Sequence, residues 1–419
     1  MRIRTAAALV VLSLVAGAAH AGDWPQWRGP EQNGVSRDAG PPLRWTTNEN
    51  VTWKLALPEW SGSTPIVLGD RIFLSVAEGE KLSLWGVSRK DGSVLWKKPL
   101  GTGNVKMRKQ NMSSPSPVTD GKSVFALTGT GVVKGFDLEG NERWSRDLQA
   151  EYGPFGLNWG DASSPLLFEG SLYVQVLHGM KTDDPSYILR IDAATGKNVW
   201  KVERPSDAIQ EAPDSYTTPA VVRLGKNTEI VITGGDCVTG HDPGTGRELW
   251  RANGLNPSKD PWYRIVASPV VSGDLVIAPT RVRPLLAVRA GGRGDVTKSH
   301  RVWSFDNGPD VPTPIVDGRH VYIVNDKGIV WCLDQATGKE VYGQQRLKPG
   351  TYSASPVLAD GKIYTTSEEG LTSVIKAGSS FELLAENNLE DYTLSSPSVS
   401  EGQIFIRTAK HLYCIGSRK

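Results

Sequence analysis

HDPGTGRELW occupies residues 241–250, and two close copies lie elsewhere in the chain, IDAATGKNVW at 191–200 and LDQATGKEVY at 333–342. Each copy contains an aspartate, a Thr-Gly pair and a closing aromatic residue. Glycine tolerates the positive φ that a tight turn needs, and the aspartate can accept backbone N–H bonds across that turn. The stretch therefore predicts a β-hairpin that recurs along the chain.

A longer unit surrounds these copies. It begins with Ser or Thr followed by Pro and continues through apolar segments separated by glycine turns. Eight such prolines are spaced 41 to 54 residues apart, which is typical of a propeller or a solenoid. They are Pro65, Pro117, Pro165, Pro219, Pro269, Pro314, Pro356 and Pro397.

The sixth unit illustrates the expected strands. TPIVD at 313–317 reads as an inner strand, and its proline stands where no ladder donor is needed. HVYIVN at 320–325, IVWCLD at 329–334 and EVY at 340–342 read as three further strands. A large aromatic side chain on the last strand can cover the neighbouring unit. The residues predicted to do this are Trp53, Trp96, Trp144, Trp200, Trp250, Trp303 and Tyr342.

The eighth unit contains only three strands, whereas NVTWKLAL at 50–57 has the pattern of a fourth. We therefore predict an all-β fold, an eight-bladed β-propeller of four-stranded antiparallel blades. An N-terminal strand completes the last blade, and closure removes exposed sheet edges. The propeller is assigned to residues 50–419, and residues 22–49 are expected to pack on the ring.

Residues 1–21 resemble a secretory signal, with Arg2 and Arg4 before an apolar run and Ala19-His20-Ala21 at the expected cleavage site. We expect a cleaved, monomeric, periplasmic or secreted protein; a retained N-terminal anchor is the alternative. No later apolar run is long enough to cross a membrane. Without the signal, 45 basic and 45 acidic residues remain, which argues against a nucleic-acid partner but does not address local patches.

The motif D-x-x-T-G-K-x-x-W after a [ST]-P strand resembles the tryptophan-docking repeat of the pyrroloquinoline quinone (PQQ) propellers. The resemblance covers Val51 to Gly416. It implies one of two functions: a quinoprotein dehydrogenase that holds PQQ and calcium above the channel, or a non-enzymatic BamB-like scaffold for outer-membrane assembly. The adjacent cysteine pair of many dehydrogenases is missing, and so is the lipid-modified cysteine of BamB. Trp24, Trp27 and Arg28 are expected to pin the N-terminus to the ring.

Propeller geometry predicts where a site lies. The connections between blades and the loops between second and third strands share one face, and rigid scaffolds present binding residues on such loops. Tyr, Trp and Arg are enriched there, as in interface hot spots; capping of the inner strands and binding of a small planar ligand are the alternatives. The predicted face contains Trp60, Asn111, Trp159, Asp161, Tyr216, Trp262, Tyr263, Arg264, Arg281, Tyr352 and Tyr392.

These observations favour a non-enzymatic exported propeller that binds a protein or peptide partner in the cell envelope. No cofactor, metal site or catalytic residue is predicted. The alternative is a PQQ- and calcium-dependent dehydrogenase of alcohols or sugars. Under that alternative, Arg264, Arg281 and Arg283 can pair with the carboxylates of PQQ. Asp161 is then the candidate base or calcium ligand.

Overall fold

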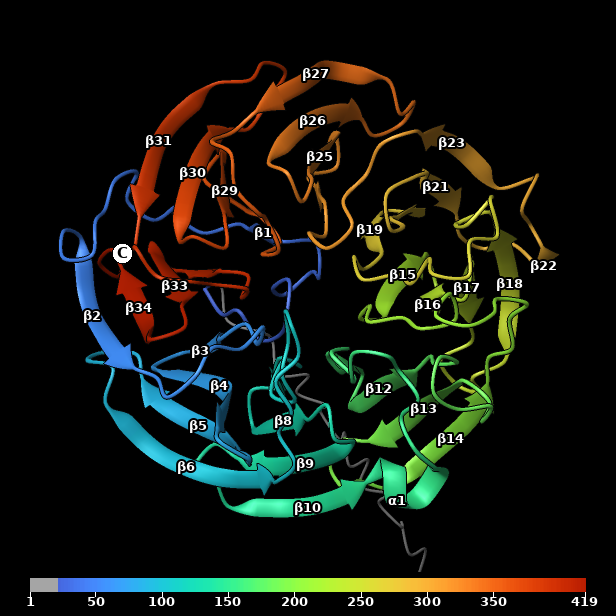
Figure 1. Cartoon of the computed structure of the whole chain (residues 1–419), viewed down its shortest axis with the longest axis horizontal. Helices are drawn as coiled ribbons and strands as arrows, with labels where there is room; N and C mark the ends of the chain where they lie inside the picture. The colour runs from blue at the N-terminus through green and yellow to red at the C-terminus, as the bar shows by residue number, and fades with distance from the viewer. Residues whose placement is uncertain (1–21) are drawn as a thin grey trace, which may run out of the picture.

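The computed structural model describes residues 22–419, which form a ring of eight antiparallel sheets around a central axis (Figure 1). This confirms the predicted eight-bladed β-propeller. The predicted signal peptide, residues 1–21, lies outside the described residues. Among residues 22–419 the helix is a single short one, α1 (Leu148–Tyr152), and no helix there has the length and hydropathy of a membrane span.

Each blade runs from an inner strand beside the axis to an outer strand at the periphery. Blade 1 consists, in that order, of β3 (Ile66–Leu68), β4 (Arg71–Glu78), β5 (Lys81–Ser88) and β6 (Val94–Gly101), and blade 2 of β7 (Val118–Thr119), β8 (Ser123–Leu127), β9 (Val132–Asp137) and β10 (Glu142–Asp147). Blade 3 consists of β11 (Leu166–Phe168), β12 (Ser171–Val176), β13 (Tyr187–Asp192) and β14 (Asn198–Glu203). Blade 4 consists of β15 (Ala220–Leu224), β16 (Asn227–Gly234), β17 (Cys237–His241) and β18 (Glu248–Asn253).

Blades 5 to 8 follow the same order. Blade 5 consists of β19 (Val270–Ser272), β20 (Leu275–Ala278), β21 (Leu285–Arg289) and β23 (Arg301–Phe305), and blade 6 of β24 (Ile315–Val316), β25 (His320–Val324), β26 (Ile329–Asp334) and β27 (Glu340–Arg346). Blade 7 consists of β28 (Val357–Ala359), β29 (Lys362–Thr366), β30 (Leu371–Lys376) and β31 (Leu383–Asn388). Blade 8 consists of β32 (Ser398–Ser400), β33 (Gln403–Arg407), β34 (His411–Ile415) and β2 (Val51–Ala56). The short strand β22 (Gly294–Asp295) adds in parallel to the outer edge of β18.

Blade 8 closes the ring as predicted. β2 pairs antiparallel with β34, with Trp53 opposite Cys414. Figure 1 shows β2, near the start of the chain, directly beside β34, near its end. The closure joins the two ends of the chain in one sheet, so neither end leaves an unpaired edge between the first and last blades.

The repeated Asp-x-x-Thr-Gly stretch forms the outer hairpin turn of a blade. In blade 4, Asp242 Oδ1 accepts hydrogen bonds from the backbone N and the hydroxyl of Thr245, both at 2.8 Å. Gly246 has φ +77°, a left-handed conformation that L side chains rarely adopt. A Cβ added at Gly246 would lie 2.7 Å from the Trp200 ring of blade 3. The glycine is therefore needed both for the turn and for contact with the preceding blade.

Five closing tryptophans donate a hydrogen bond to a backbone carbonyl in the outer hairpin turn of the next blade. Trp200 Nε1 donates to Pro243 O of the next blade at 3.0 Å. Four other indoles do the same toward their next blades: Trp53 to Arg89 O, Trp96 to Leu138 O, Trp144 to Ala193 O and Trp303 to Gln335 O.

Two closing aromatics differ. Trp250 instead donates to Glu229 Oε2 within its own blade at 2.7 Å, beneath β22. Tyr342 packs on Phe381 of blade 7, with ring centroids 6.1 Å apart.

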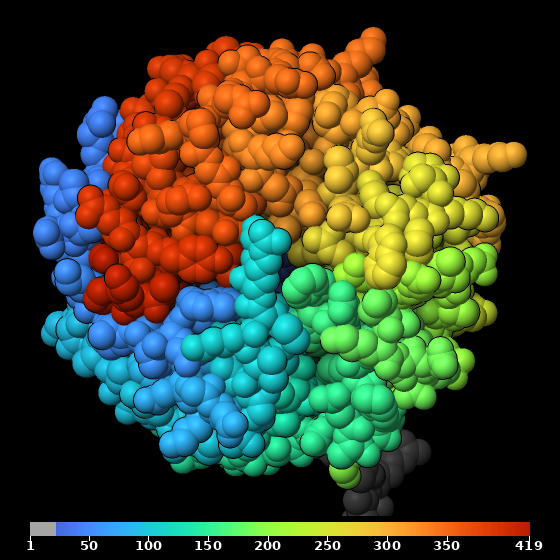
Figure 2. Space-filling model, in the orientation of Figure 1, coloured from blue at the N-terminus to red at the C-terminus, as the bar shows by residue number. Residues whose placement is uncertain are grey.

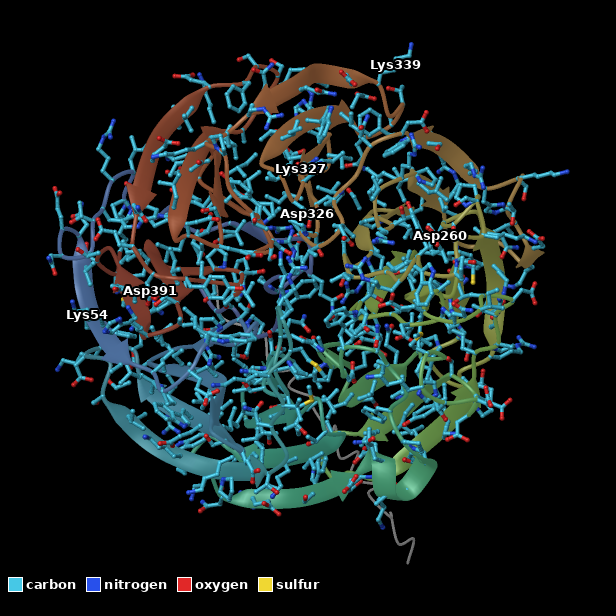
Figure 3. The ribbon with its side chains drawn as sticks, viewed as in Figure 1. Lys54, Asp260, Asp326, Lys327, Lys339 and Asp391 are labelled. Carbon is cyan, nitrogen blue, oxygen red and sulfur yellow. The ribbon has the colours of Figure 1, made fainter. Side chains whose placement is uncertain are left out.

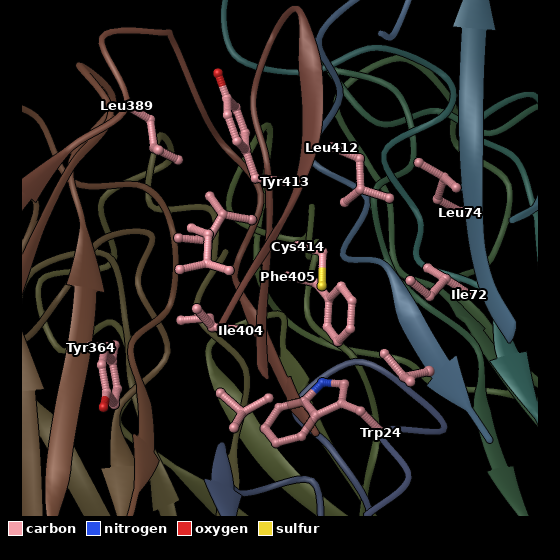
Figure 4. Close-up of a cluster of buried hydrophobic side chains, with 14 of the residues drawn as sticks. Trp24, Ile72, Leu74, Tyr364, Leu389, Ile404, Phe405, Leu412, Tyr413 and Cys414 are labelled. Atoms are coloured by element: carbon pink, nitrogen blue, oxygen red, sulfur yellow. The ribbon is translucent and has the colours of Figure 1, made fainter. Parts of the chain in front are cut away.

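The hydrophobic core lies between blades rather than in one central mass. Figure 4 shows the cluster where blades 8 and 1 meet, in which Phe405 and Cys414 lie near Ile72 and above Trp24. The three cysteines are buried free thiols, as their wide spacing in the sequence suggests. Each interface buries apolar side chains from both of its blades, so the ring is held together by contacts between neighbours.

Residues 24–36 enter the channel and pair with inner strands. Trp24 exchanges two backbone hydrogen bonds with Val67 of blade 1, each 2.9 Å long. Pro25 O accepts a bond from Thr119 N of blade 2 at 2.9 Å. Val67 is the middle residue of β3, and Thr119 is the last residue of β7.

The same segment continues across the axis to blades 6 and 7. The buried guanidinium of Arg28 donates to the carbonyl oxygens of Pro314 and Pro356. Beyond it, β1 (Val35–Ser36) pairs in parallel with β28 (Figure 1). The N-terminal segment therefore occupies the channel at one end and leaves the other end open.

Candidate functional site

The open end of the channel forms a cavity of about 710 Å³ on the face that carries the connections between blades. Figure 2 looks onto this face and shows the hollow at the axis. Trp27, from the N-terminal segment, contributes to the cavity wall. The volume falls within the range of small-molecule and peptide sites.

A ring of Ser and Thr hydroxyls surrounds the channel. In each case the backbone N of the residue before an inner-strand proline donates to the hydroxyl of the equivalent residue in the next blade. One such bond runs from Thr218 N to Ser268 Oγ at 2.9 Å, and the next from Ser268 N to Thr313 Oγ1 at 3.0 Å. The hydroxyls that accept in this way belong to Ser116, Ser164, Thr218, Ser268, Thr313, Ser355 and Ser396.

These seven hydroxyls all line the cavity. Each accepts an N–H bond, and none donates to an acceptor within residues 22–419. A hydroxyl carries one proton and two lone pairs, so the ring presents seven O–H donors toward the channel.

The ionisable side chains of the cavity are mostly basic. Five cationic side chains and two carboxylates line it: Arg108, Lys109, Arg264, Arg281 and Lys327, with Asp310 and Asp326. The ion pairs among residues 22–419 include Lys109 and Arg264 but not Arg108, Arg281 or Lys327. The mouth therefore carries local positive charge although the chain from residue 22 onward has balanced charge.

The two carboxylates of the wall are already engaged. Arg264 binds Asp310 with both arms of its guanidinium, at 2.8 and 3.1 Å. Asp326 accepts the backbone N of Asp310 at 2.6 Å and that of Val311 at 3.2 Å. Burial and then the nearby Asp310 raise the pKa of Asp326 to about 6. Figure 3 labels Asp326 and Lys327 at the inner end of blade 6.

One ion pair crosses the mouth. Lys109, on the connection into blade 2, contacts Glu368 of blade 7 with Nζ 2.7 Å from Oε1. In Figure 2 the cyan part of the chain reaches over the hollow at the axis. This contact restricts the opening on the side of blades 8 and 1.

The predicted aromatic face divides into exposed and buried members. Trp159 and Trp262 are exposed, at 38% and 49%. Trp60 and Tyr392 are half-buried and meet edge to face, with centroids 6.4 Å apart. Tyr352, in contrast, is fully buried and donates to Lys348 O.

The other predicted residues support neighbouring loops. The Asn111 amide is buried and donates to Trp60 O at 2.6 Å. The Tyr216 hydroxyl accepts Trp159 N at 3.2 Å and lines the cavity. Arg281 Nη1 donates to Trp262 O at 3.0 Å.

Tyr263 is almost buried, and its hydroxyl organises the loop before β21. That hydroxyl donates to Arg283 O at 2.7 Å and accepts Val282 N at 3.2 Å. It thereby fixes the loop from which Val282 projects, and Val282 is 52% exposed.

Three exposed apolar side chains lie beside the mouth, on the loops of blades 3 to 5. Trp159 and Val282 line the cavity, and Trp262 is joined to it through Arg281; we call these three residues the apolar rim. Trp159 Nε1 donates to Glu211 Oε1 at 2.8 Å, and Glu211 N donates to Pro261 O at 2.9 Å, which ties the loops together. The sequence does not indicate Val282, because an isolated apolar residue in a loop carries no periodic signal.

Asp161 does not line the cavity. Its side chain is buried, Oδ1 accepts Ser163 N at 2.9 Å, and Oδ2 has no hydrogen-bond partner among residues 22–419. Burial raises the pKa of Asp161 to about 7. Ser61 and Thr393 accept the equivalent backbone N–H in their blades. The position therefore supports the turn that precedes an inner strand.

A family model described as "Outer membrane protein assembly factor BamB" matches residues 45–181 and 160–344 of the chain. A curated relative, the outer membrane protein assembly factor BamB of Alkalilimnicola ehrlichii, is 28% identical over 196 residues. That alignment covers 44% of this chain and 49% of the relative, so it spans about half the length of that protein.

Solved structures agree with the fold. The crystal structure of BamB from Moraxella catarrhalis superposes with a TM-score of 0.63 at 14% identity, covering 86% of this chain and 98% of that one. Quinohemoprotein alcohol dehydrogenase from Comamonas testosteroni gives a TM-score of 0.68 at 12% identity, covering 96% and 82%. At these identities the likeness concerns the fold alone.

Proposed function

Because the chain belongs to the family described as outer membrane protein assembly factor BamB, we propose that it is a non-enzymatic propeller of the cell envelope that binds a protein or peptide partner. The partner binds through the channel face. The apolar rim is the observation that carries this proposal. Soluble proteins rarely gather several exposed large apolar residues at one place unless a partner covers them.

The composition of the rim suits a protein partner. Its two indoles are of the residue type most enriched in interface hot spots. The other exposed apolar side chains are distributed differently. Leu95, Val199, Val302 and Leu383 lie singly on four outer strands, and Val105 and Ile209 lie on separate loops. Scattered residues of that kind need no partner, so the rim is the surface that does.

Rigid support of the rim also favours binding. Trp159 is held by the hydroxyl of Tyr216 and by Glu211, and Trp262 N donates to Asp260 Oδ1 at 2.9 Å. Preorganised anchors lose less conformational entropy when a partner binds. The predicted export and monomeric state belong to the same proposal, and N-terminal sequencing and light scattering of the purified protein test them.

The test compares the double variant Trp159→Ala/Trp262→Ala with Leu95→Ala/Val302→Ala, which removes exposed apolar groups from outer strands. Each purified protein is used to capture partners from envelope extracts of the native host, and thermal unfolding is measured in parallel. The rim variant should lose the captured partner while its unfolding midpoint changes little, and the control should retain capture. A destabilised rim variant that still captures the partner would contradict the proposal.

A PQQ-dependent dehydrogenase is the second candidate. It is favoured by the basic cavity, because PQQ carries three carboxylates that Arg264, Arg281 and Arg108 could pair with. The calcium ion fits less well. Both oxygens of Asp310 bind Arg264, both oxygens of Asp326 accept backbone N–H groups, and no group of three potential metal ligands converges among residues 22–419. Calcium needs several free oxygen ligands, so we derive no reaction step through it.

A further inference from the structure

We infer that the open end of the channel binds an acidic peptide segment, whose Asp or Glu carboxylates enter the cavity while flanking apolar residues lie on the rim. This inference rests on the proposed function and specifies the chemistry of the partner. It follows from three features of the cavity: its unpaired cations, its hydroxyl ring and its position beside the apolar rim.

The cavity wall carries three cationic side chains without an ion-pair partner in the part of the chain that the structure describes. Arg108, Arg281 and Lys327 line the cavity without an ion pair among residues 22–419, whereas the two carboxylates of the wall are bonded to Arg264 and to backbone N–H groups. A partner with negatively charged groups is therefore electrostatically complementary to this opening. Guanidinium groups bind carboxylates with two parallel hydrogen bonds, so Arg281 and Arg108 suit Asp or Glu side chains.

The hydroxyl ring adds hydrogen-bond donors, which also favour a carboxylate ligand. Its seven hydroxyls accept N–H bonds from the ring itself and keep their protons for a ligand. A carboxylate accepts several hydrogen bonds and donates none. The wall therefore offers hydrogen-bond donors and positive charge to whatever enters.

The apolar rim adjoins the cationic mouth. Arg281 lines the cavity and donates to Trp262 O, so the cationic mouth and the rim are continuous. A segment that alternates acidic and large apolar residues can place the former in the cavity and the latter on Trp159 and Trp262. An extended chain alternates its side chains between two sides, which suits such a division.

The test uses fluorescence anisotropy of the purified protein with three labelled decapeptides. One alternates glutamate with leucine and tyrosine, the second has glutamine in place of glutamate, and the third has lysine there. The glutamate peptide should bind about tenfold more tightly than the glutamine peptide in low salt, and the difference should shrink as salt screens the exposed charges. The lysine peptide should bind most weakly.

A matched pair of variants locates the effect on blade 6. Lys327→Gln removes a cation at the mouth, and Arg319→Gln removes an exposed cation from the turn between β24 and β25, at the other end of the same blade. Lys327→Gln should weaken the glutamate peptide several-fold and leave the glutamine peptide unchanged. Arg319→Gln should change neither.

Equal affinity for the glutamate and glutamine peptides would overturn the inference, and so would equal effects of the two variants. An absence of binding by all three peptides would overturn it too. A single-stranded oligonucleotide that binds as strongly as the glutamate peptide would overturn it as well, because charge alone would then be recognised. If the acidic preference fails but Trp262→Ala weakens the glutamate and glutamine peptides alike, the proposed partner-binding face stands without it.

Discussion

Substituting Gly246 by alanine tests the physical basis of the repeat. Gly246 has φ +77°, and a Cβ there would lie 2.7 Å from the Trp200 ring of the preceding blade. Gly225 is the matched control, since it has φ +63° in the same blade but nothing within 4 Å of its Cβ position. Gly225→Ala thus introduces backbone strain alone, and Gly246→Ala introduces strain and a steric clash.

The expected magnitudes follow from these two contributions. A left-handed conformation costs an alanine about 1–2 kcal/mol, which is the whole expected loss in the free energy of unfolding for Gly225→Ala. Overpacking a fitted contact costs a further 1–3 kcal/mol or so. Gly246→Ala should therefore lose about 2–5 kcal/mol in total.

Urea unfolding followed by far-ultraviolet circular dichroism measures both losses without depending on tryptophan fluorescence. A third measurement places Gly246→Ala in a Trp200→Ala background, where the clash is absent and only the strain of about 1–2 kcal/mol should remain. Equal losses for the two glycine variants would refute the reasoning. So would a cost of Gly246→Ala that Trp200→Ala leaves unchanged.

Three further predictions concern the channel and the candidate site. Ser268→Ala should lower the free energy of unfolding by about 1–3 kcal/mol because the Thr218 N–H loses its acceptor, whereas Ser268→Thr keeps the hydroxyl and should change it little, as chemical denaturation will show. The pKa of Asp161 is raised, so its ionisation destabilises the folded protein increasingly as the pH rises from about 4 toward 7. Asp161→Asn should accordingly raise the thermal midpoint more at pH 8 than at pH 5, and an equal gain at both would contradict the assignment. Titration of the purified protein with PQQ in calcium buffer should give no dye reduction with alcohols or sugars; saturable binding with dye reduction would establish the second candidate function instead.

The fold could be predicted from the sequence because its signals are local and repeated. The Asp-x-x-Thr-Gly turn, the [ST]-P strand start and the isolated strand at 50–57 each act over a few residues. Eight repetitions then fix the number of blades. β2 closing on β34 follows from counting strands, without knowledge of any long-range contact.

The site could be predicted only in part because it depends on which side chains face one another across the ring. Each [ST]-P pair indicates a strand start in the sequence, whereas the hydroxyl ring exists only because the ring of blades brings these residues next to one another. Tyr352 and Trp262 precede inner strands in similar ways in the sequence, yet one is buried and the other is 49% exposed. The balanced charge of the chain likewise conceals the basic mouth, since no sequence window contains Arg108, Arg281 and Lys327 together.

Photo-crosslinking in the native host tests the central claim most directly. A benzoylphenylalanine replaces Trp262 on the apolar rim in one strain and Arg319 at the opposite end of the channel in another. We predict that position 262 crosslinks to a defined envelope protein and that position 319 does not. Crosslinking of the same protein from both positions, or from 319 alone, would contradict binding through the channel face.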